Sequence, residues 1–201
     1  ADGGVDAGMM DAGPPVCLGS DSPSPEEFPH WPIPTTGVGG LPNARSYAAV
    51  GDLVTDLVTG LQWQRSASAE MTQPEAVAYC ESLVLAGCSD WRLPTWAEAM
   101  SDIDLTVATP SIDESAFISV SFTSMWTTTP AVDVAGSYWI AGLGYGDINT
   151  QDGAASGVAR CVRDRSTPSG ARYSLTTEIV TDNYTGLAWQ RTPGAAMSFS
   201  A

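Results

Sequence analysis

Val54-Thr55-Asp56-Leu57-Val58-Thr59-Gly60-Leu61-Gln62-Trp63-Gln64-Arg65 is a stretch that this chain repeats. The second version reads Val180-Thr181-Asp182-Asn183-Tyr184-Thr185-Gly186-Leu187-Ala188-Trp189-Gln190-Arg191 and lies 126 residues further on. At the same offset Tyr47 matches Tyr173. Similarity at a fixed spacing is the signature of repeated structural units. We therefore expect one complete unit followed by the opening of a second.

Short segments of alternating apolar character surround the first version of the stretch. They predict strands at 47–50, 53–56 and 61–64. Val58-Thr59-Gly60 supplies the turn of a β-hairpin between the last two. We expect Trp63 to point into the core.

Two helices are predicted after the hairpin. Thr72-Gln73-Pro74-Glu75 is a capping box with proline in the first turn, and the apolar spacing after it predicts a helix that ends at Gly87 as a C-cap. A second capping box, formed by Thr95 and Glu98, opens a short helix that runs to about Ile103.

The segment between these helices has more bulky side chains than a solvent-exposed connecting loop. We interpret it as a rigid structural corner made of Trp91, Arg92, Leu93 and Pro94. The guanidinium of Arg92 needs a carboxylate partner beside so much apolar surface. The candidates are Asp56, Asp90 and Glu98. A structural ion pair is favoured over a role for Arg92 in binding or catalysis.

Three further strands are predicted at 124–128, 137–143 and 158–164, after an irregular acidic stretch at 106–119. The loop at 144–153 is rich in Gly, Asp and Asn, whose oxygens suit calcium. Its spacing matches no EF-hand, and a solvated turn is the favoured interpretation. We therefore expect no cofactor and no metal, with calcium as the alternative.

The charge balance narrows the classes of partner. Asp and Glu number 23 and Lys and Arg number 8, with no lysine, for a net charge of −15. Nucleic acids and anionic membranes both require basic surfaces, so neither is an expected partner. No apolar run approaches the roughly 20 residues of a transmembrane segment, and no signal peptide is present. We expect a mature protein that is secreted or located at the cell surface.

Residues 1–44 have the composition of an extended arm or linker, being rich in Gly, Asp, Pro and Ser. Trp31 lies in its proline-rich part and gives the arm an apolar group with which to dock on a neighbour. The alternative is a spacer that tethers the domain to a cell surface. We expect a single domain at 45–165, followed at 166–201 by a linker and a partial second repeat.

The cysteines indicate disulfides in an oxidising compartment, because they show no metal-binding spacing and the sole histidine, His30, lies in the arm. Three pairings are possible among Cys17, Cys80, Cys88 and Cys161.

Several motifs, in the right order, resemble the C-terminal domain family of collagen-like adhesins, a bacterial module. They are the Val-Thr-Asp-x-x-Thr-Gly-Leu-x-Trp-Gln pattern of 54–64, the Tyr-Cys-Glu-Ser-Leu of 79–83, the Ser-Asp-Trp-Arg-Leu-Pro-Thr of 89–95, the Pro-Ser-Ile-Asp of 110–113 and the Arg-Cys-Val-Arg of 160–163. The resemblance spans about residues 45–165 and restarts at 173.

The resemblance implies an α+β, C-type-lectin-like fold with two helices and a small, mostly antiparallel sheet, related in shape to formylglycine-generating enzymes. In that fold a cysteine of the first helix is bonded to one of the last strand, which here implies a Cys80–Cys161 disulfide. Cys17 and Cys88 then either pair with each other, or Cys17 reaches another chain.

Catalysis is not expected, because no Ser-His or Cys-His pair can form with His30 confined to the arm. A formylglycine-generating activity is less favoured still, since it requires active cysteines. The remaining alternatives are a surface-tethered adhesin or carbohydrate-binding module, with extracellular glycans as partners, and a structural protein. Asn183 heads a glycosylation sequon.

The partial second unit favours the structural alternative. Its strand-forming and aromatic residues come without the helices and final strands that should cover them. A head-to-tail contact that does not close into a ring builds a filament. We therefore expect a secreted protein that assembles with copies of itself into an extracellular fibre through exchanged terminal segments, using Trp31, Tyr173, Val180, Tyr184, Leu187 and Trp189.

Overall fold

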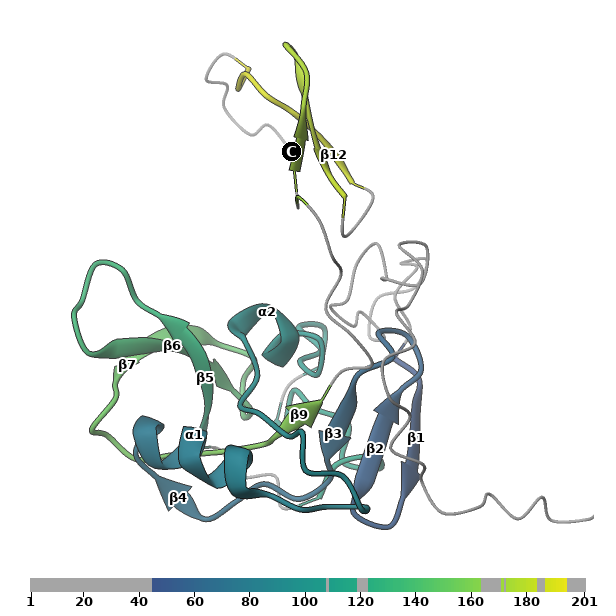
Figure 1. The fold of residues 1–201 in the computed structure, drawn as a ribbon, viewed down its shortest axis with the longest axis vertical. Helices are drawn as coiled ribbons and strands as arrows, with labels where there is room; N and C mark the ends of the chain where they lie inside the picture. The colour runs from purple at the N-terminus through teal and green to yellow at the C-terminus, as the bar shows by residue number, and fades with distance from the viewer. Residues whose placement is uncertain are drawn as a thin grey trace, which may run out of the picture.

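The computed structural model describes residues 45–107, 109–118, 123–163, 171, 173–183 and 187–194 (Figure 1). The predictions for the arm at 1–44, including Cys17 and Trp31, and for Tyr184 lie outside the described residues. The described chain is α+β, with two helices and mostly antiparallel sheets, as expected. No described helix is both long and apolar enough to cross a membrane.

The first sheet has the strand order β1-β2-β3-β9 and is antiparallel throughout. Its strands are β1 (Tyr47–Val50), β2 (Leu53–Asp56), β3 (Gln62–Gln64) and β9 (Val162–Arg163).

The turn between β2 and β3 is fixed by its own side chains. The Asp56 carboxylate accepts hydrogen bonds from the Val58 backbone N–H at 2.8 Å and the Thr59 hydroxyl at 2.6 Å. Gly60 has φ of 74°, which a residue with a Cβ rarely adopts. The predicted hairpin is confirmed, and Trp63 is fully buried.

The first helix, α1 (Gln73–Ser82), starts at the predicted capping box. It ends earlier than predicted, because Gly87 does not cap it. The chain leaves the helix at Leu83, and Ala86 and Gly87, both with positive φ, form a tight turn in which Leu85 and Cys88 exchange backbone hydrogen bonds.

The second helix, α2 (Trp96–Ala99), is a single turn that stops short of the predicted end at Ile103. The chain beyond it tightens into turns, since the N–H of Ser101 bonds to the carbonyl of Glu98. The N–H of Asp104 then pairs with the distant carbonyl of Ser111. Tertiary pairing therefore replaces the helix.

The second sheet has the order β4-β8-β5-β6-β7, and its one parallel pair is β5 with β8. Its strands are β4 (Glu70–Met71), β5 (Ser124–Pro130), β6 (Ser137–Gly142), β7 (Ile148–Asp152) and β8 (Gly157–Val158).

Two predictions about this region were wrong. Residues 148–152 of the predicted polar loop form β7, because each pairs with β6 across a hairpin. The single strand predicted at 158–164 is two strands, β8 and β9, which belong to different sheets. The chain between them, Ala159–Cys161, crosses the core and is completely buried.

A disulfide joins Cys80 of α1 to Cys161 in this crossing, with Cα atoms 5.4 Å apart. It is the pairing that the family resemblance implies. The disulfide fastens the helix to the segment between the two sheets, at the centre of a core cluster that includes Trp91, Leu93 and Trp126.

A third sheet contains β10 (Tyr173–Leu175), β11 (Ile179–Asp182) and β12 (Ala188–Gln190) in that order. Figure 1 shows it at the top, apart from the body formed by the other two sheets.

Removal of the Cys80–Cys161 disulfide should destabilise the first unit strongly. The two cysteines are 81 residues apart, and loop-closure entropy for a loop of this size corresponds to about 4 kcal/mol. We expect the double substitution to serine to lower the free energy of unfolding in urea by roughly that amount. Peptide mapping under non-reducing conditions should recover the linkage from the native chain, and a free thiol at either position would contradict it.

Candidate functional site

The third sheet is a structural copy of the first three strands. Each residue pair of the third sheet has its counterpart in the first sheet, 126 residues earlier in the sequence. Val54 opposite Trp63 becomes Val180 opposite Trp189. The closing bond of the turn recurs too, as the N–H of Asp182 donates to the carbonyl of Leu187 at 2.9 Å.

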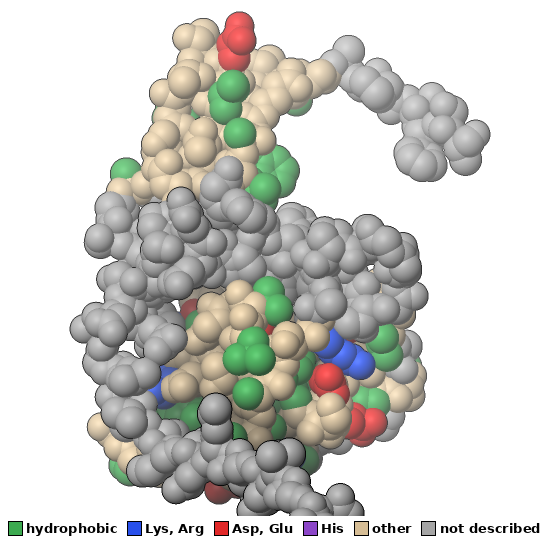
Figure 2. All heavy atoms as spheres, turned by 90° about the vertical axis from the view of Figure 1, so that its right-hand side faces the viewer, with side chains coloured by type: hydrophobic (Ala, Val, Ile, Leu, Met, Phe, Trp, Pro, Cys, Tyr) green, Lys and Arg blue, Asp and Glu red, His purple; other side chains and the backbone are tan. Residues whose placement is uncertain are grey.

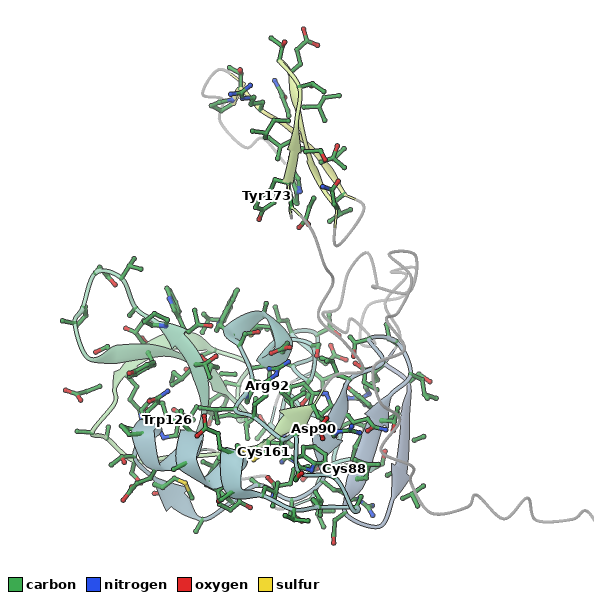
Figure 3. All side chains as sticks on the ribbon, in the orientation of Figure 1. Cys88, Asp90, Arg92, Trp126, Cys161 and Tyr173 are labelled. Carbon is green, nitrogen blue, oxygen red and sulfur yellow. A yellow bond between two sulfur atoms is a disulfide. The ribbon has the colours of Figure 1, made fainter. Side chains whose placement is uncertain are left out.

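The two copies differ in what covers them. Trp63 is 0% exposed, whereas Trp189 is 54% exposed. Tyr47 packs its ring edge against Phe117 with centroids 5.2 Å apart, whereas Tyr173 is 51% exposed. Figure 3 shows Tyr173 on the third sheet, away from the labelled core residues.

One side of the third sheet is largely apolar. We call this side the β10–β12 face, and its members are Tyr173, Leu175, Val180, Leu187 and Trp189. Val180 and Leu187 are half-buried, and Leu175 is exposed where the first unit has the smaller Ala49. Figure 2 shows hydrophobic side chains at the surface of this upper lobe. An open groove borders Trp189, lined by Glu178, Ile179, Ala188, Gln190 and Thr192.

Polar contacts within the third sheet hold it in shape. Asp182 is buried at the position of Asp56. The side-chain amide of Asn183 donates to the Ala171 carbonyl and to the Ser174 hydroxyl, both at 2.8 Å. Asn183 is at the surface, and its glycosylation stays a prediction.

The predicted corner lies beside β9. Trp91 is buried, and its indole N–H donates to the Cys88 carbonyl at 3.2 Å. Leu93 and Pro94 are buried as well. The backbone of Arg92 exchanges hydrogen bonds with Val162, so the corner extends the first sheet beyond its last strand.

Two arginines of the corner region bind carboxylates in a bidentate manner. Arg92 donates to Glu98 at 2.8 and 2.6 Å, which decides among its three candidate partners. Asp90 instead accepts from Arg163 at 2.8 and 2.9 Å.

These contacts lower the pKa of both carboxyl groups, Asp90 and Glu98. The hydrogen bonds from Arg163 lower the pKa of Asp90. For Glu98, burial alone would raise the pKa, but the hydrogen bonds and the charge of Arg92 outweigh it and the pKa is lowered. Both groups are therefore carboxylates at neutral pH, and the geometry is that of a structural corner.

Metal-binding clusters and free thiols are both missing from the part of the chain that the structure describes. No group of three or more His, Cys, Asp or Glu side chains there is arranged to hold a metal ion. No cysteine among the described residues is a free thiol. The expectation that no metal binds, with calcium at 144–153 as the alternative, stays a prediction.

A scan against protein-family models matches residues 52–163 to the Lcl C-terminal domain. The chain belongs to the Lcl C-terminal domain family. A search of curated proteins found no match. The matched residues begin just before β2 and end with β9, so the Lcl C-terminal domain takes in the corner, both helices and the disulfide.

The sequence motifs located the corner and the second hairpin, but they missed a pair of buried charged residues. Asp102 and Arg160 are both buried beneath the first sheet. Arg160 belongs to the Arg-Cys-Val-Arg motif of 160–163, and this motif was the only signal that could have drawn attention to it. Nothing in the local sequence marks Asp102.

Trp91 should contribute much more to stability than Arg92. Removing a fully buried Trp costs about 3–5 kcal/mol. The side chain of Arg92 is 35% exposed, and partly exposed ion pairs contribute about 1 kcal/mol or less. We expect Trp91→Ala to lower the free energy of unfolding by the larger amount and Arg92→Ala by the smaller. Urea unfolding measures both, with the exposed Tyr145→Ala as a control. Equal effects of Trp91→Ala and the control would contradict the structural interpretation.

Acid should weaken the corner. A carboxyl group whose folded pKa is lowered adds stability above its unfolded pKa, about 4, and loses it as the pH falls through the folded pKa. We expect the free energy of unfolding to drop below about pH 4, and Asp90→Asn or Glu98→Gln to reduce this drop. Urea unfolding from pH 2 to 7 is the measurement. Glu81→Gln, on the exposed side of α1, should leave the acid response unchanged.

Proposed function

We propose that this Lcl C-terminal domain protein is a secreted or surface-located structural protein of adhesin type, which associates head-to-tail with copies of itself through the β10–β12 face. The observation that supports the proposal most directly is the contrast between Trp63 and Trp189. The same strands in the same register bury one tryptophan completely and leave the other half exposed.

Covering this face on another chain is energetically favourable. Aromatic side chains bury 150–250 Å² each, so removing the exposed half of Trp189 from water contributes about 3 kcal/mol. Tyr173 and Leu175 add to the same surface. Tryptophan and tyrosine at the centre of a contact are the residues that dominate binding energies.

The stoichiometry of the chain argues for docking on a neighbour's outer surface. Each chain has two three-stranded units, β1–β3 and β10–β12. Among the described residues only one core covers such a unit, and β1–β3 occupies it. If β10–β12 of one chain replaced β1–β3 of another, one exposed face would be covered and another uncovered. Replacement therefore brings no gain, whereas docking on an unused surface does.

Sheet edges offer a contact beside this face, through which one chain can be placed against the next. In β3 the N–H of Gln64 faces β9 and donates to the Cys161 carbonyl. Gln190 is its counterpart in β12, which has no further partner strand among the described residues. β1 likewise ends the first sheet as described. Pairing of β12 with a neighbour's β1 joins unlike surfaces, and repetition of that contact extends a fibre.

Truncation and a single substitution test the proposal. We expect the full chain to form elongated assemblies, and the chain that lacks residues 171–201 to remain folded and monomeric. Trp189→Ala should weaken assembly, whereas the exposed aromatic control Tyr145→Ala should not. Sedimentation velocity and electron microscopy at equal concentrations are the measurements. They should be made near physiological ionic strength, because the net charge of −15 opposes association at low salt.

Two outcomes contradict head-to-tail assembly. A discrete dimer would mean that two β10–β12 faces pack on each other symmetrically. A full chain that stays monomeric at high concentration would favour the alternative, a surface adhesin or carbohydrate-binding module. For that alternative the surface to probe is the half-buried pair Trp96 and Trp139, whose ring centroids lie 6.0 Å apart.

A further inference from the structure

A buried pair of opposite charges lies beneath the first sheet. Asp102, in the turns after α2, is 1% exposed, and Arg160, between β8 and β9, is fully buried. Burial raises the pKa of Asp102 and lowers the pKa of Arg160. The charge of Arg160 opposes the first shift, and the charge of Asp102 opposes the second, so the two groups interact. No hydrogen bond joins them directly.

Arg160 is bound mainly by groups that carry no charge. One terminal nitrogen, Nη1, donates to the carbonyls of Gln64, at 3.0 Å, and Arg65. The other, Nη2, donates to the carbonyl of Ile118 at 3.4 Å. The guanidinium carbon lies 4.8 Å from the centre of the Phe117 ring. These contacts leave the Nε–H of Arg160 without an acceptor.

The burial of the Asp102 carboxylate is energetically less favourable than that of the Arg160 guanidinium. Neither of its oxygens accepts a hydrogen bond from the protein. A buried carboxylate without partners costs several kcal/mol, so it either takes up a proton or obtains hydrogen bonds from another molecule.

Three more buried groups in or against this core have no hydrogen-bond partner in the protein. They are the indole N–H groups of Trp63 and Trp96 and the hydroxyl of Ser111. Trp63 belongs to the same core cluster as Ile103 and Ile112, the chain neighbours of Asp102 and Ser111. Asp102 and Arg160 also share neighbours. The Tyr47 hydroxyl donates to the carbonyl of Ser101 at 3.5 Å, and the Tyr47 ring packs on Phe117, over which the Arg160 guanidinium lies.

The chemistry of these atoms selects the molecule that fits. A cation is disfavoured by the guanidinium, and an anion by the carboxylate. Water accepts from N–H donors and donates to carboxylate oxygens at the same time, and buried waters typically make about three hydrogen bonds to such groups.

We propose that internal water bridges the Asp102 carboxylate to the Nε–H of Arg160. The pair is then a hydrated ion pair in which both groups stay charged at neutral pH. Through it, the turns after α2 are held to β3 and to the crossing between the sheets. The proposal is independent of the association through β10–β12.

The alternative is a dry cluster in which Asp102 is protonated. Burial raises the pKa of Asp102, Arg160 opposes this rise, and Asp56 adds to it. Tyr47, whose own pKa is raised chiefly by burial and then by Asp102, is the remaining titratable group that faces the carboxyl. A protonated Asp102 would make stability fall as the pH rises from about 4 towards the raised pKa.

Comparison of the full chain with Asp102→Asn distinguishes these states. If the pair is hydrated and charged, Asp102→Asn should raise the unfolding equilibrium constant at least tenfold at pH 7, by an amount that is constant from pH 6 to 9. The exposed Asp133→Asn is the matched control. A penalty that shrinks as the pH rises, or a more stable Asp102→Asn variant, would show a protonated carboxyl and overturn the proposal.

Magnetic relaxation dispersion of water protons or ¹⁷O provides a direct readout, because it detects water molecules held inside a protein. We expect an internal-water signal in the full chain that Asp102→Leu reduces and Asp133→Leu does not. An equal signal in all three proteins would overturn the proposal. If Asp102→Leu does not fold, the pH comparison with Asp102→Asn decides.

Discussion

The crossing from Gly157 to Arg163 is the constraint on which the rest of the first unit depends. β8, at its start, pairs with both β4 and β5, and β9, at its end, closes the first sheet. Cys161, between them, is bonded to α1. The segment is buried along its whole length. It therefore has to be extended, mostly apolar and able to satisfy two internal arginines, and few sequences meet these conditions together.

Local features of the fold could be predicted because their causes are local. The hairpin turn depends on Asp56 and Gly60, and both helix starts depend on capping boxes a few residues long. Helix ends could not be predicted, because distant partners set them. The pairing of Leu85 with Cys88 and of Asp104 with Ser111 takes the backbone away from helical hydrogen bonding. β7 exists for the same reason, since β6 pairs with polar residues that by themselves favour a loop.

Burial was harder to predict than secondary structure. Trp63 and Trp189 have nearly the same neighbours in sequence and the same cross-strand partners, yet only one is covered. Coverage comes from Phe117, Val162 and other residues far along the chain, so the short motif around each tryptophan carries no information about it. Glu98 was among the three candidate partners of Arg92, because the two residues are only six positions apart. Asp102 and Arg160 are 58 residues apart, and no local pattern connects them.

The identical register of the two hairpin copies has a consequence for biosynthesis. Either copy matches the core that covers β1–β3, so the two compete for one position while the chain folds. A ribosome or an export channel delivers the chain from its N-terminus, and domains generally fold as units in that order. The first copy and the whole of the core at 65–163 are delivered before β10 appears. The order of delivery thus gives the first copy the earlier access to the core.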